Sequence, residues 1–422
     1  MSGTLAGFAQ FVTHLENMQI LEAYKLKPII DGRTLSKALS IKPGPWMKPA
    51  LDVVMQWQLR NPNRTDTTEV IEEIKAKQGE LVNSLAHHFL RLTIRPSFAK
   101  TQHPSVTSAG RRSINEDIAS KFTYMEIDDT ETRPWKYDGY SLNMLRWIIS
   151  VLNAQLIEEI WHLLLPPLLV IVDDSSASVK AQGCNLLTGF LKATPQTLLA
   201  RTGIDGIIEE AVMPCLMYLP TLTPEEESVA LLSAAYPGLL NLANARYADY
   251  TQNEKTSDNR SRFLDKLVRK GIIYGLSHAG ENVKVAQTLL DQLGRITLSL
   301  GIESVKHLKA LLPMLSRYLT DPLGPVSPPL LLSAAKAMQS LILSSWPRIS
   351  FHRFEILRAL AICWVHASDM EYQHGLKREL REAAAMLKAA ATAANIELAG
   401  ETRVLEDENA TLKELFSNPA GI

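Results

Sequence analysis

Residues Trp161 to Thr194 read WHLLLPPLLVIVDDSSASVKAQGCNLLTGFLKAT, which is two apolar helical stretches joined by a polar turn. Apolar residues recur at helical spacing on both sides of that turn, Asp173 to Ser176, whose side chains stop the first helix and supply N-caps for the second. Neither helix can bury its apolar stripe alone. The pair therefore predicts stacked neighbours, as in a helical solenoid.

A proline recurs in the first helix of successive pairs. It stands in Leu-Pro-Pro-Leu at 165–168, Met-Pro-Cys-Leu at 213–216 and Leu-Pro-Met-Leu at 312–315. Because a proline inside a helix bends it, we expect three bent first helices. The prolines are 47 and then 99 residues apart, so one repeat without a proline should lie between the last two. Helices over 262–276 and 283–300 supply it.

A helix-turn-helix period near 47 residues is typical of HEAT repeats. An ordinary bundle of average-length helices gives the same number of pairs, but it does not explain why proline position and turn chemistry recur together. We therefore predict an all-α, HEAT-like helical-repeat solenoid over residues 136–422. A linker and first helix over 86–135 and a small helical segment over 1–85 should precede it.

Three stretches depart from the repeat. Residues 101–135 mix Ser, Thr, Gly, Pro and charge without helical period, which predicts a long loop. Residues 249–260 are expected to form a shorter polar insertion. Residues 322–329 hold four prolines and predict an extended or turn connection before a helix at Leu330. Farther along, an Ala-rich helix should run through about Ala394.

Composition indicates a folded, soluble protein, with 46% hydrophobic and 21% charged residues. The net charge of -1 excludes a global attraction to nucleic acid or an anionic membrane. Apolar runs such as 163–172 are shorter than the about 20 residues of a membrane span. The N-terminus lacks the pattern of a secretory signal, so we expect a cytoplasmic and nuclear protein. Three cysteines in apolar helical contexts read as buried thiols: Cys184, Cys215 and Cys363.

The sequence contains none of the common catalytic motifs. Phosphate-binding GxGxxG and GxxxxGK[ST], the GxSxG elbow and HExxH are all missing, so we predict neither an enzyme nor a cofactor. The adjacent His87 and His88 would point about 100° apart on a helix, which does not suit one metal ion. The pairs Asp128-Asp129 and Asp173-Asp174 resemble a cation site, but a capped turn explains the second pair better.

An acidic turn follows Thr223 and Pro224, which are expected to be the N-cap and first residue of a helix. Three acids in a first turn favour the helix dipole, and this accounts for them fully. The functional alternative is an acidic knob for a basic partner. Its residues would be Glu225, Glu226 and Glu227.

The first 80 residues predict a helix over 8–23 and another from Pro45 to about Arg60. Basic residues exceed acidic ones around the motif that runs from Leu26 to Trp46, and such a local excess can contact phosphates. Solvated lysines explain it equally well. The candidate RNA-contacting residues are Lys27, Arg33, Lys42 and Lys48.

Several motifs after about Leu90 resemble one family. They are Leu92-Thr-Ile-Arg95-Pro96, Val106-Thr-Ser-Ala-Gly110-Arg111, Arg133-Pro-Trp135-Lys136, the helix Trp161 to Asp174, Leu198-Leu199-Ala-Arg201-Thr202-Gly203 and Met213 to Ser228. From there to the C-terminus the chain resembles the fungal branch of the Tel-Two-Interacting-protein-Two family, the third subunit of the Triple-T complex.

The resemblance implies a HEAT-like, non-catalytic scaffold that works with the Tel-two protein and the first Tel-two interactor. It further implies that these help phosphatidylinositol-3-kinase-related kinases mature with the heat-shock chaperone machinery. Arg201 and the acidic turn after Pro224 would then contact partners, and no membrane contact is implied.

Residues 7 to about 80 resemble another family, the C-terminal tail of a fungal CCA-adding tRNA nucleotidyltransferase. Leu26 to Ile30, Asp31-Gly-Arg33 and Lys42-Pro-Gly-Pro-Trp46 through Leu59 carry that resemblance. The Gly-Ser stretch and Asp-x-Asp metal pair of the catalytic head are missing from this sequence. We therefore expect weak tRNA contact without nucleotide transfer. Two unrelated families meeting near residue 85 suggest a fused or misjoined gene model.

Overall fold

The computed structural model is all-α across the part of the chain that it describes, which confirms the predicted fold class. Those residues are 13, 27–39, 47–61, 64, 66–99, 133–249, 251–368 and 374–417. The chain divides into two compact units, Met1–Leu92 and Thr93–Ile422. The helix predicted over 8–23, Lys42, Pro45, Asp128-Asp129 and nearly all of the loop predicted over 101–135 lie outside the described residues.

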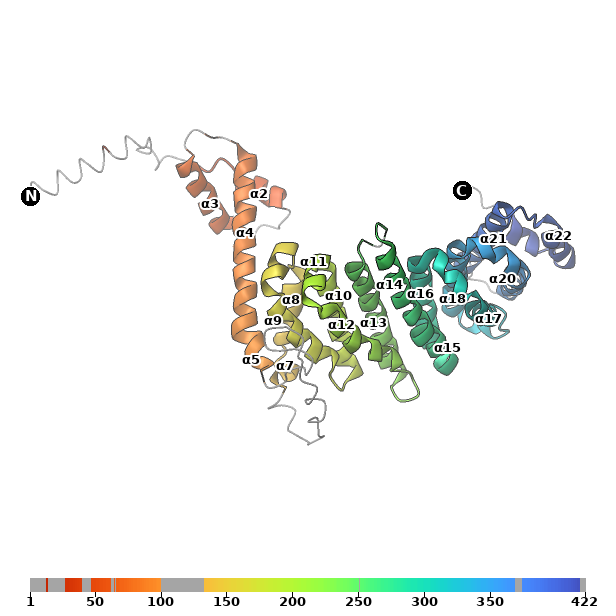
Figure 1. The fold of residues 1–422 in the computed structure, drawn as a ribbon. Helices are drawn as coiled ribbons and strands as arrows, with labels where there is room; N and C mark the ends of the chain where they lie inside the picture. The colour runs from red at the N-terminus through yellow and green to blue at the C-terminus, as the bar shows by residue number, and fades with distance from the viewer. Residues whose placement is uncertain are drawn as a thin grey trace, which may run out of the picture. The chain divides into compact units, whose positions relative to one another are not determined.

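The first unit packs α2 (Gly32–Leu39), α3 (Met47–Arg60) and the start of α4 (Thr67–Phe89) around a small core (Figure 1). The core side chains are Ile30, Leu35, Ala50, Val54, Trp57, Val70 and Ile74. The buried Gln58 fixes the segment before α2, since its Nε2 donates to the carbonyl oxygen of Lys27 at 3.1 Å and its Oε1 accepts from Ile29 N at 3.2 Å. As predicted, α3 ends at Arg60.

The second unit is a succession of helices. A π-helical turn at Leu90–Ile94 leads into it from α4. Its further elements are α5 (Arg95–Ser97), α7 (Pro134–Tyr137), α8 (Ser141–Ser150), α9 (Ala154–Val172), α10 (Ala177–Ala193), α11 (Gln196–Thr202), α12 (Ile204–Val212), η4 (Met213–Met217), α13 (Glu225–Arg246), α14 (Glu254–Lys266), η5 (Leu267–Ile273), α15 (Tyr274–Ala279), α16 (Val283–Leu300), η6 (Gly301–His307), α17 (Leu308–Leu319), η7 (Gly324–Val326), α18 (Pro328–Ser344), α19 (Trp346–Ile349), η8 (Ser350–His352), α20 (Arg353–Ser368), α21 (His374–Ala393), α22 (Ala399–Glu408) and α23 (Leu412–Phe416).

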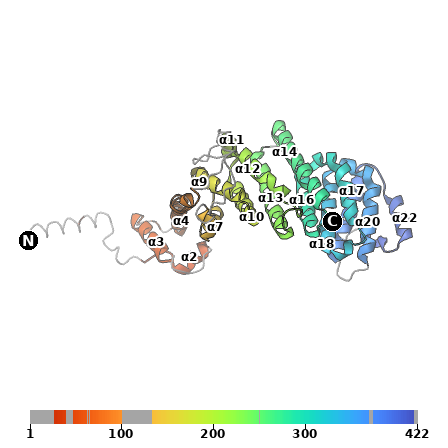
Figure 2. The ribbon, with the colours of Figure 1, turned by 90° about the horizontal axis from the view of Figure 1, so that it is seen from below.

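These helices pack in serial order. Helix α10 packs on α9 and on α13, α13 on α16, α16 on α18, and α18 on α21. Figures 1 and 2 show the same succession from two directions. A helical-repeat array is expected to pack in this serial way, and the repeat arrangement itself stays a prediction.

The opening pair of the sequence forms α9 and α10 as expected, with a sharp turn at Asp173 to Ser176. Asn153 caps α9, because its Oδ1 accepts a hydrogen bond from Leu156 N at 2.8 Å. Gly183 lets the two helices approach closely: a Cβ atom there would lie 2.8 Å from the backbone nitrogen of Val172. Close backbone contact therefore holds this pair together.

Helix α9 is longer than the apolar run 163–172 that it contains. Its 19 residues meet the length and composition of a membrane span. No other helix among the described residues does so. Of the apolar stretch in α9, 56% is buried inside the protein. A core helix of a folded domain passes the same test. The apolar side chains of α9 pack on α10 as core residues do.

Ion pairs link successive helices on the surface. Glu209 of α12 accepts hydrogen bonds from Arg246 Nη1 of α13 at 2.9 Å and from Lys266 Nζ of α14 at 2.6 Å. Farther along, Asp265 Oδ1 of α14 lies 2.8 Å from Nε2 of the buried His307. Partly exposed pairs of this kind each contribute modestly to stability.

Several predicted boundaries were wrong, and proline explains two of them. Pro313 lies inside α17 and Pro166 and Pro167 inside α9, as predicted. Pro214 is instead the second residue of the 3-10 helix η4, which follows the end of α12 at Val212. Over 322–329 the connection contains η7, and α18 begins at Pro328, since proline is well tolerated in a first helical turn.

The remaining differences lie between residues 223 and 393. The insertion predicted over 249–260 is mostly helical, because Asn253 caps α14 by accepting from Thr256 N at 3.3 Å. With η5 and α15, that helix extends the one predicted over 262–276 as far as Ala279. The next helix has the predicted bounds, Val283–Leu300. Pro224, not Thr223, is the N-cap of α13, and α21 ends at Ala393, close to the prediction.

Candidate protein-interaction surfaces

The predicted partner-binding residues occupy two places in the second unit. Arg201 lies at the end of α11 with a side chain 63% exposed, and its Nη2 donates to Glu158 of α9 at 2.8 Å. Gly203, which follows with a φ of 66°, ends that helix in the left-handed conformation that favours glycine. Arg201 therefore joins two helices within the chain while most of its surface faces solvent.

The acidic turn forms the first turn of α13. Glu226 is exposed, whereas Glu225 and Glu227 are half-buried. Glu225 Oε1 lies 3.8 Å from Lys284 Nζ of α16, and this ion pair links α13 to α16. Among the described residues, no ion pair joins Arg201 to any of these acids.

The first unit presents the predicted basic residues that the structure describes. All three are exposed: Lys27 lies on the segment before α2, Arg33 on α2 and Lys48 on α3. Asp31 next to Arg33 is committed to capping α2, since Thr34 N donates to its Oδ1 at 2.7 Å and lowers the pKa of the carboxyl. The three cations are therefore available to a polyanion.

The positions considered for chemistry have structural roles. Within the described residues, no group of three or more His, Cys, Asp or Glu side chains could hold a metal ion. The three cysteines are buried free thiols, as predicted. Asp174 is buried, and its Oδ1 accepts from Ser176 N at 2.8 Å, so it holds the turn before α10, although no side chain caps that helix.

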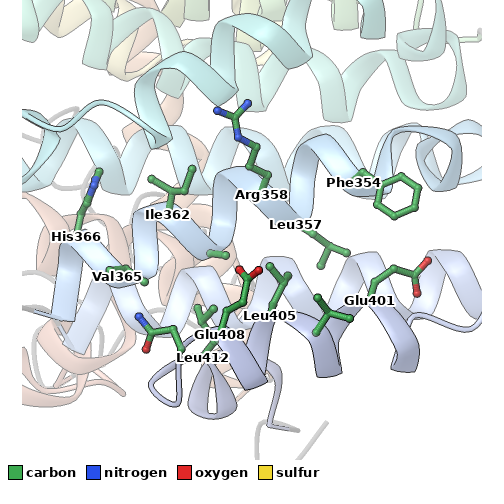
Figure 3. A pocket seen from close by; sticks show the side chains of 13 residues that line it. Phe354, Leu357, Arg358, Ile362, Val365, His366, Glu401, Leu405, Glu408 and Leu412 are labelled. Carbon is green, nitrogen blue, oxygen red and sulfur yellow. The ribbon is translucent and has the colours of Figure 1, made fainter.

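A surface groove that the sequence analysis missed lies between α20 and α22, with a volume of about 690 Å³. Figure 3 shows Leu357 of α20 and Leu405 of α22 facing one another between the helices. We refer to this feature as the C-terminal groove. Its lining residues are Phe354, Leu357, Arg358, Ala361, Ile362, Val365, His366, Glu401, Val404, Leu405, Glu408, Asn409 and Leu412.

Both ends of α22 are tied to α20, so the groove is held in shape by the fold. At the start of α22, Arg353 Nε donates to Glu401 at 3.2 Å, and the same guanidinium lies 4.3 Å from the ring centre of Phe354. Beyond the end of α22, the indole nitrogen of the buried Trp364 donates to the carbonyl oxygen of Thr411 at 3.0 Å.

A sequence signal for this groove existed in α20. The buried side of that helix carries Ile356, Leu360 and Cys363 at helical spacing. A second apolar set, Phe354 with Ile362, extends along another side of the same helix. Apolar residues on two sides predict two packing partners for one helix.

Comparison with known proteins identifies the family. A family model described as the Tti2 family matches residues 54–326, which is more than half of the chain. The chain belongs to the Tti2 family. The match begins earlier and ends earlier than the resemblance expected from about Leu90 to the C-terminus, so it includes α4 but leaves the C-terminal groove outside.

Curated relatives confirm the second resemblance. Nucleotidyltransferase lcsQ of Purpureocillium lilacinum is 43% identical over 77 residues, which is 18% of this chain and 13% of the relative. The mitochondrial CCA tRNA nucleotidyltransferase of Saccharomyces cerevisiae is 35% identical over 69 residues, or 16% of this chain and 12% of the relative. The tRNA nucleotidyltransferase cca1 of Schizosaccharomyces pombe is 38% identical over 77 residues, which is 18% of this chain and 15% of the relative. This Tti2-family chain thus spans only a small fraction of their length. No solved structure matches it.

Proposed function

We propose that this Tti2-family chain is a non-catalytic scaffold subunit of the Triple-T complex. The observation that carries the proposal is the family match over residues 54–326. The serial packing from α9 to α21 supports it, because helical-repeat arrays offer extended surfaces to large partners. The partners proposed are the Tel-two protein and the first Tel-two interactor, with a cytoplasmic and nuclear location.

The cellular role proposed is maturation and stability of phosphatidylinositol-3-kinase-related kinases, reached indirectly through the heat-shock chaperone machinery. Depleting the chain in its host tests this role directly. Quantitative immunoblots should show the kinases declining while unrelated kinases of similar size persist. Unchanged kinase abundance after complete depletion would contradict the proposal.

A second candidate function is tRNA contact by the first unit. The segment identity of up to 43% to nucleotidyltransferases favours it, as do the exposed Lys27, Arg33 and Lys48. On this alternative the chain derives from a tRNA nucleotidyltransferase and keeps residual binding without a catalytic head. Purified chain incubated with tRNA, CTP and ATP should incorporate no nucleotide, and measurable incorporation would overturn the non-catalytic assignment.

The origin of the first unit also stays a proposal. Helical structure continues from Thr67 through the π-turn to Ser97, so a junction near residue 85 would lie within one helical run. A single transcript read across residues 75–100 would show one gene product. Separate messages for the two halves would support the misjoined account.

A further inference from the structure

The C-terminal groove exposes apolar side chains that a stable surface normally covers. Phe354 on α20 is 58% exposed and Val404 on α22 is 60% exposed, and both line the groove. A contiguous exposed apolar surface marks an interaction site more often than a scattered apolar residue does. These two residues stand on opposite sides of the groove, so an occupant would contact both helices.

The dimensions of the groove suit one helix. Along α20, the lining residues extend from Phe354 to His366. At a rise of about 1.5 Å per residue these positions span roughly 18 Å, or about three turns of an α-helix. Grooves between two helices typically accept the apolar stripe of an amphipathic helix, at positions i, i+3 or i+4, and i+7.

The charges on α22 favour a partner helix with basic side chains. Its sequence AGETRVLEDE carries four acids against one arginine. Glu401 is already paired with Arg353, whereas Glu408 has no ion-pair partner within 4 Å among the described residues. Figure 3 shows the Glu408 carboxylate directed toward α20, at the groove. The α22 edge is therefore acidic and complements a basic edge on the occupant.

An anionic membrane surface does not fit the groove, because it would repel the acidic α22 edge.

From this geometry we propose that the C-terminal groove binds one amphipathic α-helix of a partner protein, with its apolar stripe against Phe354 and Val404 and its basic side chains along α22. This inference rests on the proposed scaffold function, which it deepens by giving the chemistry of one contact.

Two labelled probe peptides test the proposal on the full chain by fluorescence anisotropy. Both are about fifteen residues long and carry the same leucine stripe, one with lysines and one with glutamates along one edge. We expect the lysine peptide to bind at least tenfold more tightly. Val404→Glu should weaken that binding at least tenfold, and Glu408→Lys should reduce the preference for the lysine peptide. Leu298→Glu, at a 53% exposed position on α16 outside the groove, is the matched control and should change neither affinity.

Equal affinity for the two peptides, or a preference that Glu408→Lys does not alter, would overturn the proposal. A dimer in light scattering that Val404→Glu dissociates would assign the groove to a second copy and would overturn it as well. Phe354→Ala provides a second groove variant, and circular dichroism checks that each variant is folded.

Assembly with the two Triple-T partners, measured on the same wild-type sample, separates the two claims. If the wild type assembles but shows no peptide preference, the groove inference fails while the proposed function stands. If the preference holds but the wild type does not assemble, the proposed function fails instead.

Discussion

Arg133 donates a hydrogen bond at 2.9 Å to Asp174, whose side chain is completely shielded from solvent. Lys136 Nζ lies 3.3 Å from the other carboxylate oxygen of the same residue. The turn between α9 and α10 is thereby fastened to the residues that begin α7. Beside them, Trp135 is buried and stacks on Phe98 with ring centres 4.9 Å apart.

Replacing Asp174 should therefore destabilise the second unit. Asp174→Ala removes a buried acceptor from two cations and from Ser176 N, and we expect a loss of about 2 kcal/mol in the free energy of unfolding. Asp174→Asn should lose less, because its amide oxygen can still cap the turn. Denaturant unfolding measures both. The neighbouring, exposed Asp173→Asn is the control, and equal effects at 173 and 174 would show that the buried contacts contribute nothing.

A second prediction concerns the close contact at Gly183. Gly183→Ala should destabilise the α9–α10 pair by about 1 to 3 kcal/mol, since the added methyl group would meet the backbone of Val172 at 2.8 Å. Gly206→Ala is the matched control, because a Cβ atom there meets nothing within 4 Å and α12 is an ordinary helix. That change should stabilise by about 0.5 to 1 kcal/mol. Melting curves for the two variants should shift in opposite directions.

The cysteines should be chemically silent in the folded protein. Burial raises the pKa of the Cys363 thiol to about 12, so its reactive thiolate is scarce at pH 8. Cys184 and Cys215 are buried as well, so the reagent cannot reach them, although the hydrogen bond from Cys184 lowers the pKa of the Cys215 thiol. Ellman's reagent at pH 8 should titrate no thiol quickly in the native chain and all three after denaturation. Rapid reaction of the native protein would show that the helices around these residues open readily.

Charge reversal in the first unit tests tRNA contact. The triple variant Lys27→Glu, Arg33→Glu and Lys48→Glu should weaken tRNA binding at least tenfold. The slope of the logarithm of the tRNA-binding constant against the logarithm of salt concentration should become shallower by about 2. Lys75→Glu, at an exposed position on α4, is the control and should have a much smaller effect. Filter binding at several salt concentrations measures both. Identical salt dependence for the triple variant and wild type would remove the second candidate function.

Local patterns predicted the parts of the fold that depend on neighbouring residues. The α9–α10 pair and the bounds of α16 followed from helical periodicity and from polar stops. Periodicity could not show that Asp174 is buried, because its partners Arg133 and Lys136 are about forty residues earlier in the chain. The prediction of a structural turn was correct, but the prediction of a side-chain cap was wrong, because Ser176, the N-cap of α10, makes no side-chain cap hydrogen bond.

The C-terminal groove required tertiary information of the same kind. It arises where α20 meets α22, and the long helix α21 separates them in sequence. Val404 looks like an ordinary core residue in the sequence, and only the fold shows that it is 60% exposed. The predicted partner residues Arg201 and Glu225 to Glu227 are accessible to different extents, and their role stays a prediction.

Assembly of the complex is the most direct test of the scaffold assignment. The chain should be co-expressed with the Tel-two protein and the first Tel-two interactor, purified through a tag on this chain, and measured by size-exclusion chromatography with light scattering. We predict one peak that contains all three proteins and has their summed mass. Elution of this chain alone, while the other two proteins associate without it, would contradict its assignment as a Triple-T subunit.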